Sequence, residues 1–90
     1  MTRAEHGERS LEAARVLVAQ GDLAYWRDEN QRALDLQLAA LAIFSAAGER
    51  ARAETASARF NVGATLRQLG RLEEALAAEL QALELERALH

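Results

Sequence analysis

The 90-residue sequence has no cysteine, no proline and few aromatic side chains. Without cysteine it can form no disulfide, no thiol nucleophile and no thiolate metal site. Aromatic residues make up only 4%, and the β-branched apolar residues are Val16, Val18, Ile43 and Val62. A sheet core needs more side chains of these two kinds, so an all-β fold is excluded.

A strong charge of one sign and a long apolar run are also absent. The 11 arginines and 14 acidic residues are interspersed and leave a net charge of −3, which makes nucleic acid a poor partner. The longest apolar run, residues 38–44, is far too short to span a membrane, and we recognise no secretory signal. We therefore expect a cytoplasmic protein that makes no use of a membrane.

Chemistry-bearing residues are sparse as well. The two histidines, His6 and His90, lie near opposite ends and lack a second ligand at metal-binding spacing, so we predict no metal and no cofactor. Acidic residues such as Glu73 and Glu74 suit the start of a helix, whereas acid–base catalysis needs a pocket that perturbs their pKa. The sequence therefore predicts that the chain is not an enzyme.

What is abundant is alanine, with 21 residues, and leucine, with 15. Both favour the α-helix, so the fold class predicted is all-α. The same residues also recur 42 positions apart. The matching positions are Gly21 and Gly63, Ala33-Leu34 and Ala75-Leu76, and Ala40-Leu41 and Ala82-Leu83. A period of this size is typical of stacked helical repeats.

Apolar residues at helical spacing predict four main helices, over residues 8–27, 30–47, 49–69 and 72–89. Gly48 and Gly70 stand where a left-handed residue would end a helix. The Asp28-Glu29-Asn30 turn takes the role of Gly70 in the first unit, with Asp28 or Asn30 available as N-cap. Residues 2–6, before Gly7, are predicted to be the tail of a preceding helix, as residues 45–47 precede Gly48.

The second unit, from Asn61-Val62-Gly63-Ala64-Thr65-Leu66 through Gly70 to Gln81-Ala82-Leu83-Glu84-Leu85, resembles a tetratricopeptide repeat. The first unit matches less completely, and Ala40-Leu41-Ala42-Ile43-Phe44 followed by Gly48-Glu49-Arg50 is similar to the longer kinesin-light-chain-like and bacterial signalling subtype. The resemblance implies a right-handed superhelix of helical hairpins. It gives one domain over residues 1–90, with repeat 1 at about 7–47 and repeat 2 at about 48–90.

In this family the first helix of each hairpin lines a concave groove that holds a peptide or a partner's helix. The resemblance therefore implies these groove residues: Arg15, Val18, Asp22, Tyr25, Trp26, Ser57, Phe60, Asn61, Ala64, Arg67 and Gln68. Asn61 is the sharpest candidate, because its amide can both donate to and accept from a peptide backbone. The carboxylate-clamp variant is not reproduced, since Val18 and Asp22 replace its cation and its asparagine.

Adjacent helical residues point about 100° apart, so we expect one ring of Tyr25 and Trp26 to be packed and the other presented. Phe44 is predicted to pack beneath the next unit. The leading hypothesis is a non-enzymatic protein-interaction module within a larger signalling or scaffold protein.

Two alternatives stay open. One is a homo-oligomerisation element that stacks through the uncovered leucines Leu76, Leu80 and Leu83, because solenoids need about three units and polar end caps. The other is a sensory module that regulates an attached enzyme.

Overall fold

The computed structural model describes the backbone of residues 3–89 and the side chains of residues 10–88. Within residues 3–89 the chain forms four α-helices and one short 3₁₀ helix, with no strand. The elements are α1 (Arg3–Trp26), α2 (Asn30–Ala46), η1 (Gly48–Ala51), α3 (Arg52–Gln68) and α4 (Leu72–Leu89). The all-α prediction and its four main helices are confirmed.

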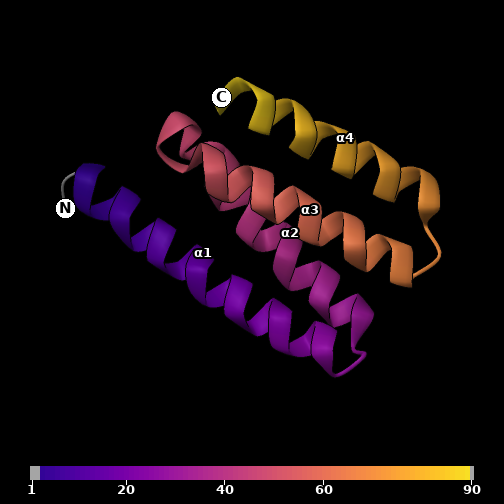
Figure 1. Cartoon of the computed structure of the whole chain (residues 1–90). Helices are drawn as coiled ribbons and strands as arrows, with labels where there is room; N and C mark the ends of the chain where they lie inside the picture. The colour runs from indigo at the N-terminus through magenta and orange to yellow at the C-terminus, as the bar shows by residue number, and fades with distance from the viewer. Residues whose placement is uncertain (1–2, 90) are drawn as a thin grey trace.

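The helices form two antiparallel hairpins, α1 with α2 and α3 with α4, and α3 also packs on α2. Figure 1 shows them following one another across the molecule in chain order, with α1 at one edge and α4 at the other. The Cα atoms span 42 × 30 × 15 Å. The molecule is thus a flat stack in which the two outer helices each have a hairpin mate on one side only.

The turns that join the helices of the two hairpins have the same conformation and lie 42 residues apart. Gly70 ends α3 with a φ of +78°, and Asp28 ends α1 with a φ of +62°. Around Gly70, the Arg71 amide donates to the Leu66 carbonyl at 2.9 Å. Around Asp28, the Glu29 amide donates to the Ala24 carbonyl, also at 2.9 Å. This bond pattern is the Schellman motif, which satisfies carbonyls at a helix end.

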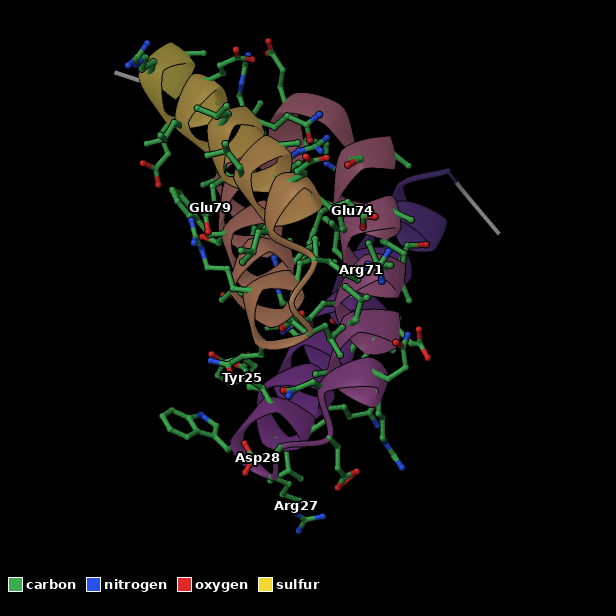
Figure 2. The ribbon with its side chains drawn as sticks, turned by 90° about the vertical axis from the view of Figure 1, so that its right-hand side faces the viewer. Tyr25, Arg27, Asp28, Arg71, Glu74 and Glu79 are labelled. Atoms are coloured by element: carbon green, nitrogen blue, oxygen red, sulfur yellow. The ribbon has the colours of Figure 1, made fainter. Side chains whose placement is uncertain are left out.

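The predicted left-handed roles of Gly48, with a φ of +66°, and Gly70 are therefore confirmed. The suggestion that Asp28 or Asn30 caps α2 is wrong. The N-cap of α2 is Glu29, without a side-chain hydrogen bond, and Asn30 is already the first helical residue. Asp28 is instead used for its tolerance of the left-handed conformation, and it lies with Arg27 and Tyr25 at this turn in Figure 2.

Two predicted helix starts also need correction. α1 runs through Gly7 without a break, so residues 3–6 belong to α1 and not to a preceding helix. One glycine costs a helix only about 1 kcal/mol, and the nearby Ala4, Glu5, Glu8 and Arg9 are strong helix formers. α3 begins at Arg52, three residues later than predicted, because Gly48 leads into the 3₁₀ turn and Ala51, with φ −126° and ψ 29°, is not α-helical.

Two apolar clusters hold the stack together. The first joins α1, α2, η1 and α3 around Phe44, which is 2% exposed, as predicted for a residue beneath the next unit. The second joins α2, α3 and α4 around Leu34, Val62 and Leu66, and Leu41 packs against both. The alanines that recur in the sequence are all fully buried: Ala33, Ala40, Ala75 and Ala82. Small side chains at these positions let the helices approach closely.

Gly63 lies where α3 approaches α4 closely, and its replacement gives a testable prediction. A Cβ at Gly63 would lie 2.8 Å from Glu79 Cγ and 3.3 Å from the Ala75 carbonyl oxygen. We expect Gly63→Ala to destabilise the fold by about 1–2 kcal/mol, because overpacking of about 1–3 kcal/mol exceeds the gain of about 1 kcal/mol in helix propensity. Urea unfolding followed by circular dichroism measures it.

Gly21, 42 residues earlier, is the matched control. A Cβ there would meet the Gln37 side chain at 3.2 Å but the Ala33 carbonyl oxygen only at 3.7 Å. We therefore expect Gly21→Ala to be close to neutral, because a contact of 3.2 Å needs a shift of only a few tenths of an ångström and the gain in helix propensity of about 1 kcal/mol offsets its cost. Equal stability of the two variants would contradict the tighter packing of the second hairpin.

Candidate functional site

A hollow of about 270 Å³ lies between α1 and α3, the first helices of the two hairpins. Phe44 and Ala58, both buried, form its floor. The full lining is Arg15, Val18, Phe44, Ala53, Glu54, Ser57, Ala58 and Asn61. The hollow thus combines an apolar floor with a rim of polar and charged side chains.

Helical spacing explains why these residues share one place. Arg15 and Val18 are three positions apart on α1, and Glu54, Ser57 and Asn61 follow at spacings of three and four on α3. Residues three and four apart lie on one face of a helix. The two faces therefore oppose each other across the hollow, with α2 beneath them supplying Phe44.

An ion pair bridges the rim from one helix to the other. The guanidinium of Arg15 lies 3.6 Å from the carboxylate of Glu54; the Arg15 side chain is exposed and the Glu54 side chain is partly exposed. Exposed pairs of this kind contribute at most about 1 kcal/mol. A charged or polar group of a bound molecule can therefore replace either partner at little cost.

Asn61 is half-buried at the rim. Among the described side chains none hydrogen-bonds it. Its amide can donate and accept at once, so the structure places a two-way hydrogen-bonding group directly beside the apolar floor.

Only some of the predicted groove residues meet at this hollow. Arg15, Val18, Ser57 and Asn61 line it. The others do not: Asp22, Tyr25, Trp26, Phe60, Ala64, Arg67 and Gln68. Most of this second group lies toward the C-terminal ends of α1 and α3, whereas the hollow occupies the middle of α1 and the first part of α3.

Arg67 is engaged on the other side of α3. Its Nε and Nη2 donate to the two carboxylate oxygens of Glu79 on α4, at 2.6 and 2.7 Å. These hydrogen bonds, with the opposite charge, lower the pKa of the Glu79 carboxyl and raise that of the Arg67 guanidinium. Arg67 thus ties the second hairpin together, which disfavours its predicted role in holding a partner.

The two adjacent aromatic residues have different surroundings. Tyr25 is half-buried, whereas Trp26 is 81% exposed. Their rings meet edge to face with centroids 6.3 Å apart. Trp26 is therefore the presented ring, at the α1–α2 turn and away from the hollow.

Sequence reasoning missed two rim residues, Ala53 and Glu54. The signal was present, because Glu54 precedes Ser57 by three positions and Asn61 by seven on the same face. Phe44 was predicted to be packed, but its second role as the floor of the hollow depends on how closely α1 approaches α3.

Within residues 3–89, no helix has both the length and the apolar composition of a membrane span. The described residues likewise contain no cluster of three potential metal ligands from histidine, cysteine, aspartate and glutamate. The side chains of His6 and His90 lie outside the described residues.

A stack of antiparallel helical hairpins that repeats every 42 residues defines a helical-repeat protein. Residues 12–88 match the family model of the tetratricopeptide repeat, so the chain belongs to that family. A search of curated proteins and of solved structures found no match. Tetratricopeptide repeats generally mediate protein–protein interaction and are typically non-catalytic.

Proposed function

We propose that the chain is a non-enzymatic module that binds a protein partner by holding a peptide or a helix in the hollow between α1 and α3. One observation carries this proposal: the first helices of both hairpins contribute a polar rim over the apolar floor of Phe44 and Ala58. An interface core needs this combination, with apolar contact at the centre and polar groups around it.

The size of the hollow favours side chains of a partner over a small molecule. Sites for small ligands typically enclose about 300–1,000 Å³, and the hollow has about 270 Å³. One or two apolar side chains of a partner fit this space, while Asn61 can pair with the partner's backbone amide. We therefore expect the partner to tolerate different residues beside the bound side chains, because a backbone contact does not depend on side-chain identity.

The family resemblance supports the wider setting of this function. The 42-residue period is similar to the longer repeat subtype found in kinesin-light-chain-like and bacterial signalling proteins. We therefore also propose that the module works in the cytoplasm, within a signalling or scaffold protein.

Selection from a displayed library of random short peptides tests the groove. We expect binders whose affinity falls at least about tenfold in Ser57→Trp, because the indole fills the hollow from an exposed position that folding does not need. Asn61→Ala should weaken them about fivefold, the equivalent of one hydrogen bond of about 1 kcal/mol. Fluorescence anisotropy of labelled peptides measures both effects.

Ser45→Trp is the matched control, because Ser45 is exposed on α2 and does not line the hollow. It should bind the selected peptides as the unmodified chain does. Peptides that bind all three variants equally, or a library that yields no binder, would contradict the groove.

A further inference from the structure

The outer side of α4 carries four leucines in one stripe. Figure 1 shows α4 at an edge of the molecule, and α3 is the helix that packs against it. The four side chains follow one another at spacings of four, four and three residues, which places them on one side of the helix. They are 42–60% exposed: Leu72, Leu76, Leu80 and Leu83. Contiguous exposed apolar surface of this kind marks an interaction surface.

The 42-residue repeat shows that part of this stripe lies where the fold accepts a helix. Leu76 corresponds to Leu34 of α2, against which α3 packs. Leu34 is 3% exposed, whereas Leu76 is 53% exposed. Leu83 corresponds in the same way to Leu41, which is half-buried between both clusters.

The same comparison shows that α4 does not repeat the contact surface of α2. The surface of α2 includes Gln37 and Phe44, both buried. Their counterparts on α4 are carboxylates, Glu79 and Glu86. Glu79 already pairs with Arg67, and Glu86 is exposed. A hairpin packed on α4 as α3 packs on α2 would bury a carboxylate in the place of a phenyl ring, which is strongly unfavourable. Neither a second copy nor another hairpin of this kind therefore fits in that register.

Carboxylates flank the leucine stripe on both sides. Glu73 and Glu84 each follow a leucine of the stripe by one residue, whereas Glu86 follows Leu83 by three. Because each residue turns the helix by about 100°, a step of one leads to one side of the stripe and a step of three to the other. All three carboxylates are exposed, and the ion pairs among the described side chains involve none of them.

These charges are specific to α4 and are not part of the repeat. The corresponding positions of α2 are uncharged: Gln31, Ala42 and Phe44. Within Leu72–Leu89 the one cation is Arg87, four residues beyond the last leucine of the stripe. The outer side of α4 thus combines an apolar centre with negative edges, and a partner with cations at the matching places complements it.

We propose that the outer side of α4 docks an amphipathic helix of another protein, whose apolar side chains cover the leucines and whose lysines or arginines meet Glu73, Glu84 and Glu86. A helix suits this surface because an apolar stripe at spacings of three and four residues can run beside the stripe of α4. Its cations pair at the edges of the contact, where the carboxylates stay in water, so no charge is buried among apolar groups.

Two synthetic helical peptides test the pairing by fluorescence anisotropy. Both carry the same stripe of leucines, and the edges of the stripe carry lysines in one peptide and glutamates in the other. We expect the lysine peptide to bind at least about tenfold more tightly, because like charges facing each other across an interface repel. Raising the salt concentration from about 0.05 to about 0.5 M should weaken it severalfold, since exposed charge pairs are screened.

Variants of α4 identify the surface. The triple variant Glu73→Gln, Glu84→Gln and Glu86→Gln should bind the lysine peptide at least about fivefold more weakly, because it loses the charges at the edges. Leu76→Gln should weaken both peptides, since it places a polar group in the apolar centre. All four residues are exposed, and circular dichroism verifies that the helices persist.

A second triple variant is the matched control. Glu12→Gln, Asp22→Asn and Glu49→Gln remove the same number of exposed charges outside α4, so this variant should bind the lysine peptide as the unmodified chain does. Ser57→Trp, which fills the hollow between α1 and α3, should also leave this binding unchanged. Failure of the groove and failure of the α4 surface are therefore distinguishable.

Three results would overturn the proposal. Equal weakening by the two triple variants would mean that the net charge of the chain attracts the peptide without a defined surface. Binding of neither peptide would make α4 a solvent-facing end of the stack. A mass that rises with protein concentration in sedimentation equilibrium, and that Leu76→Gln returns to that of the monomer, would assign the leucines to a second copy.

Discussion

Phe44→Ala should destabilise the fold by about 3–5 kcal/mol, the range for removing a buried aromatic ring. Phe44 is the largest fully buried side chain among the described residues. Its ring lies at the centre of the cluster that joins α1, α2, η1 and α3. Because small domains are stable by only about 5–15 kcal/mol in total, the variant should lose much of its stability. Urea titration followed by far-ultraviolet circular dichroism measures the loss.

Leu38→Ala on the same helix is the control. Leu38 is removed from the first cluster and substantially exposed, so its truncation should cost less than about 1 kcal/mol. Similar losses in the two variants would mean that Phe44 does not hold the two hairpins together. The comparison also bears on function, since a destabilised Phe44→Ala chain loses the floor of the hollow as well as its core.

Much of the fold was predictable because the 42-residue repeat fixes local conformation at recurring positions. Gly48 and Gly70 predict their left-handed turns, since only glycine adopts that conformation without steric cost. The repeat also predicted the corresponding turn at Asp28-Glu29-Asn30, but it did not predict that Asp28 itself adopts the left-handed conformation. The helix break predicted at Gly7 was wrong. A single glycine ends a helix only where the surrounding contacts turn the chain, and a continuous helix tolerates it.

The candidate site was predictable only in part. Family resemblance indicates which helices face the groove, and Arg15 and Asn61 do line the hollow. It does not indicate which turns of those helices come near each other. Arg67 shows the limit most clearly, because its pairing with Glu79 depends on the position of α4 relative to α3, which no local pattern specifies.

The sequence pattern of the α4 leucines likewise does not indicate which of them a neighbouring helix would cover, but comparison with α2 does. Leu76, Leu80 and Leu83 share one sequence pattern, yet their counterparts on α2 are buried, exposed and half-buried. The difference arises from how α3 crosses α2. The contact of α3 with α2 therefore shows which of these leucine positions a following hairpin covers, which the hydrophobic pattern alone does not.

A buried polar contact between the hairpins was also beyond prediction, and it gives the second large expected effect. Thr65 and Gln37 are both buried, and the threonine hydroxyl donates to the glutamine Oε1 at 2.7 Å. Thr65→Val keeps the shape of the side chain but leaves the glutamine oxygen without this donor. A buried acceptor stripped of its partner costs about 1–3 kcal/mol, so we expect a loss of that size in urea unfolding.

The double replacement Thr65→Val with Gln37→Leu separates the hydrogen bond from the packing. With both polar groups gone no unpaired atom remains, and a matched apolar pair can be nearly neutral, so most of the lost stability should return. Gln31→Ala, which removes an exposed hydrogen bond to Asp35 at 3.1 Å, should change stability by less than about 0.5 kcal/mol. A double variant no more stable than Thr65→Val would show that this contact between α2 and α3 depends on side-chain shape and not on the hydrogen bond.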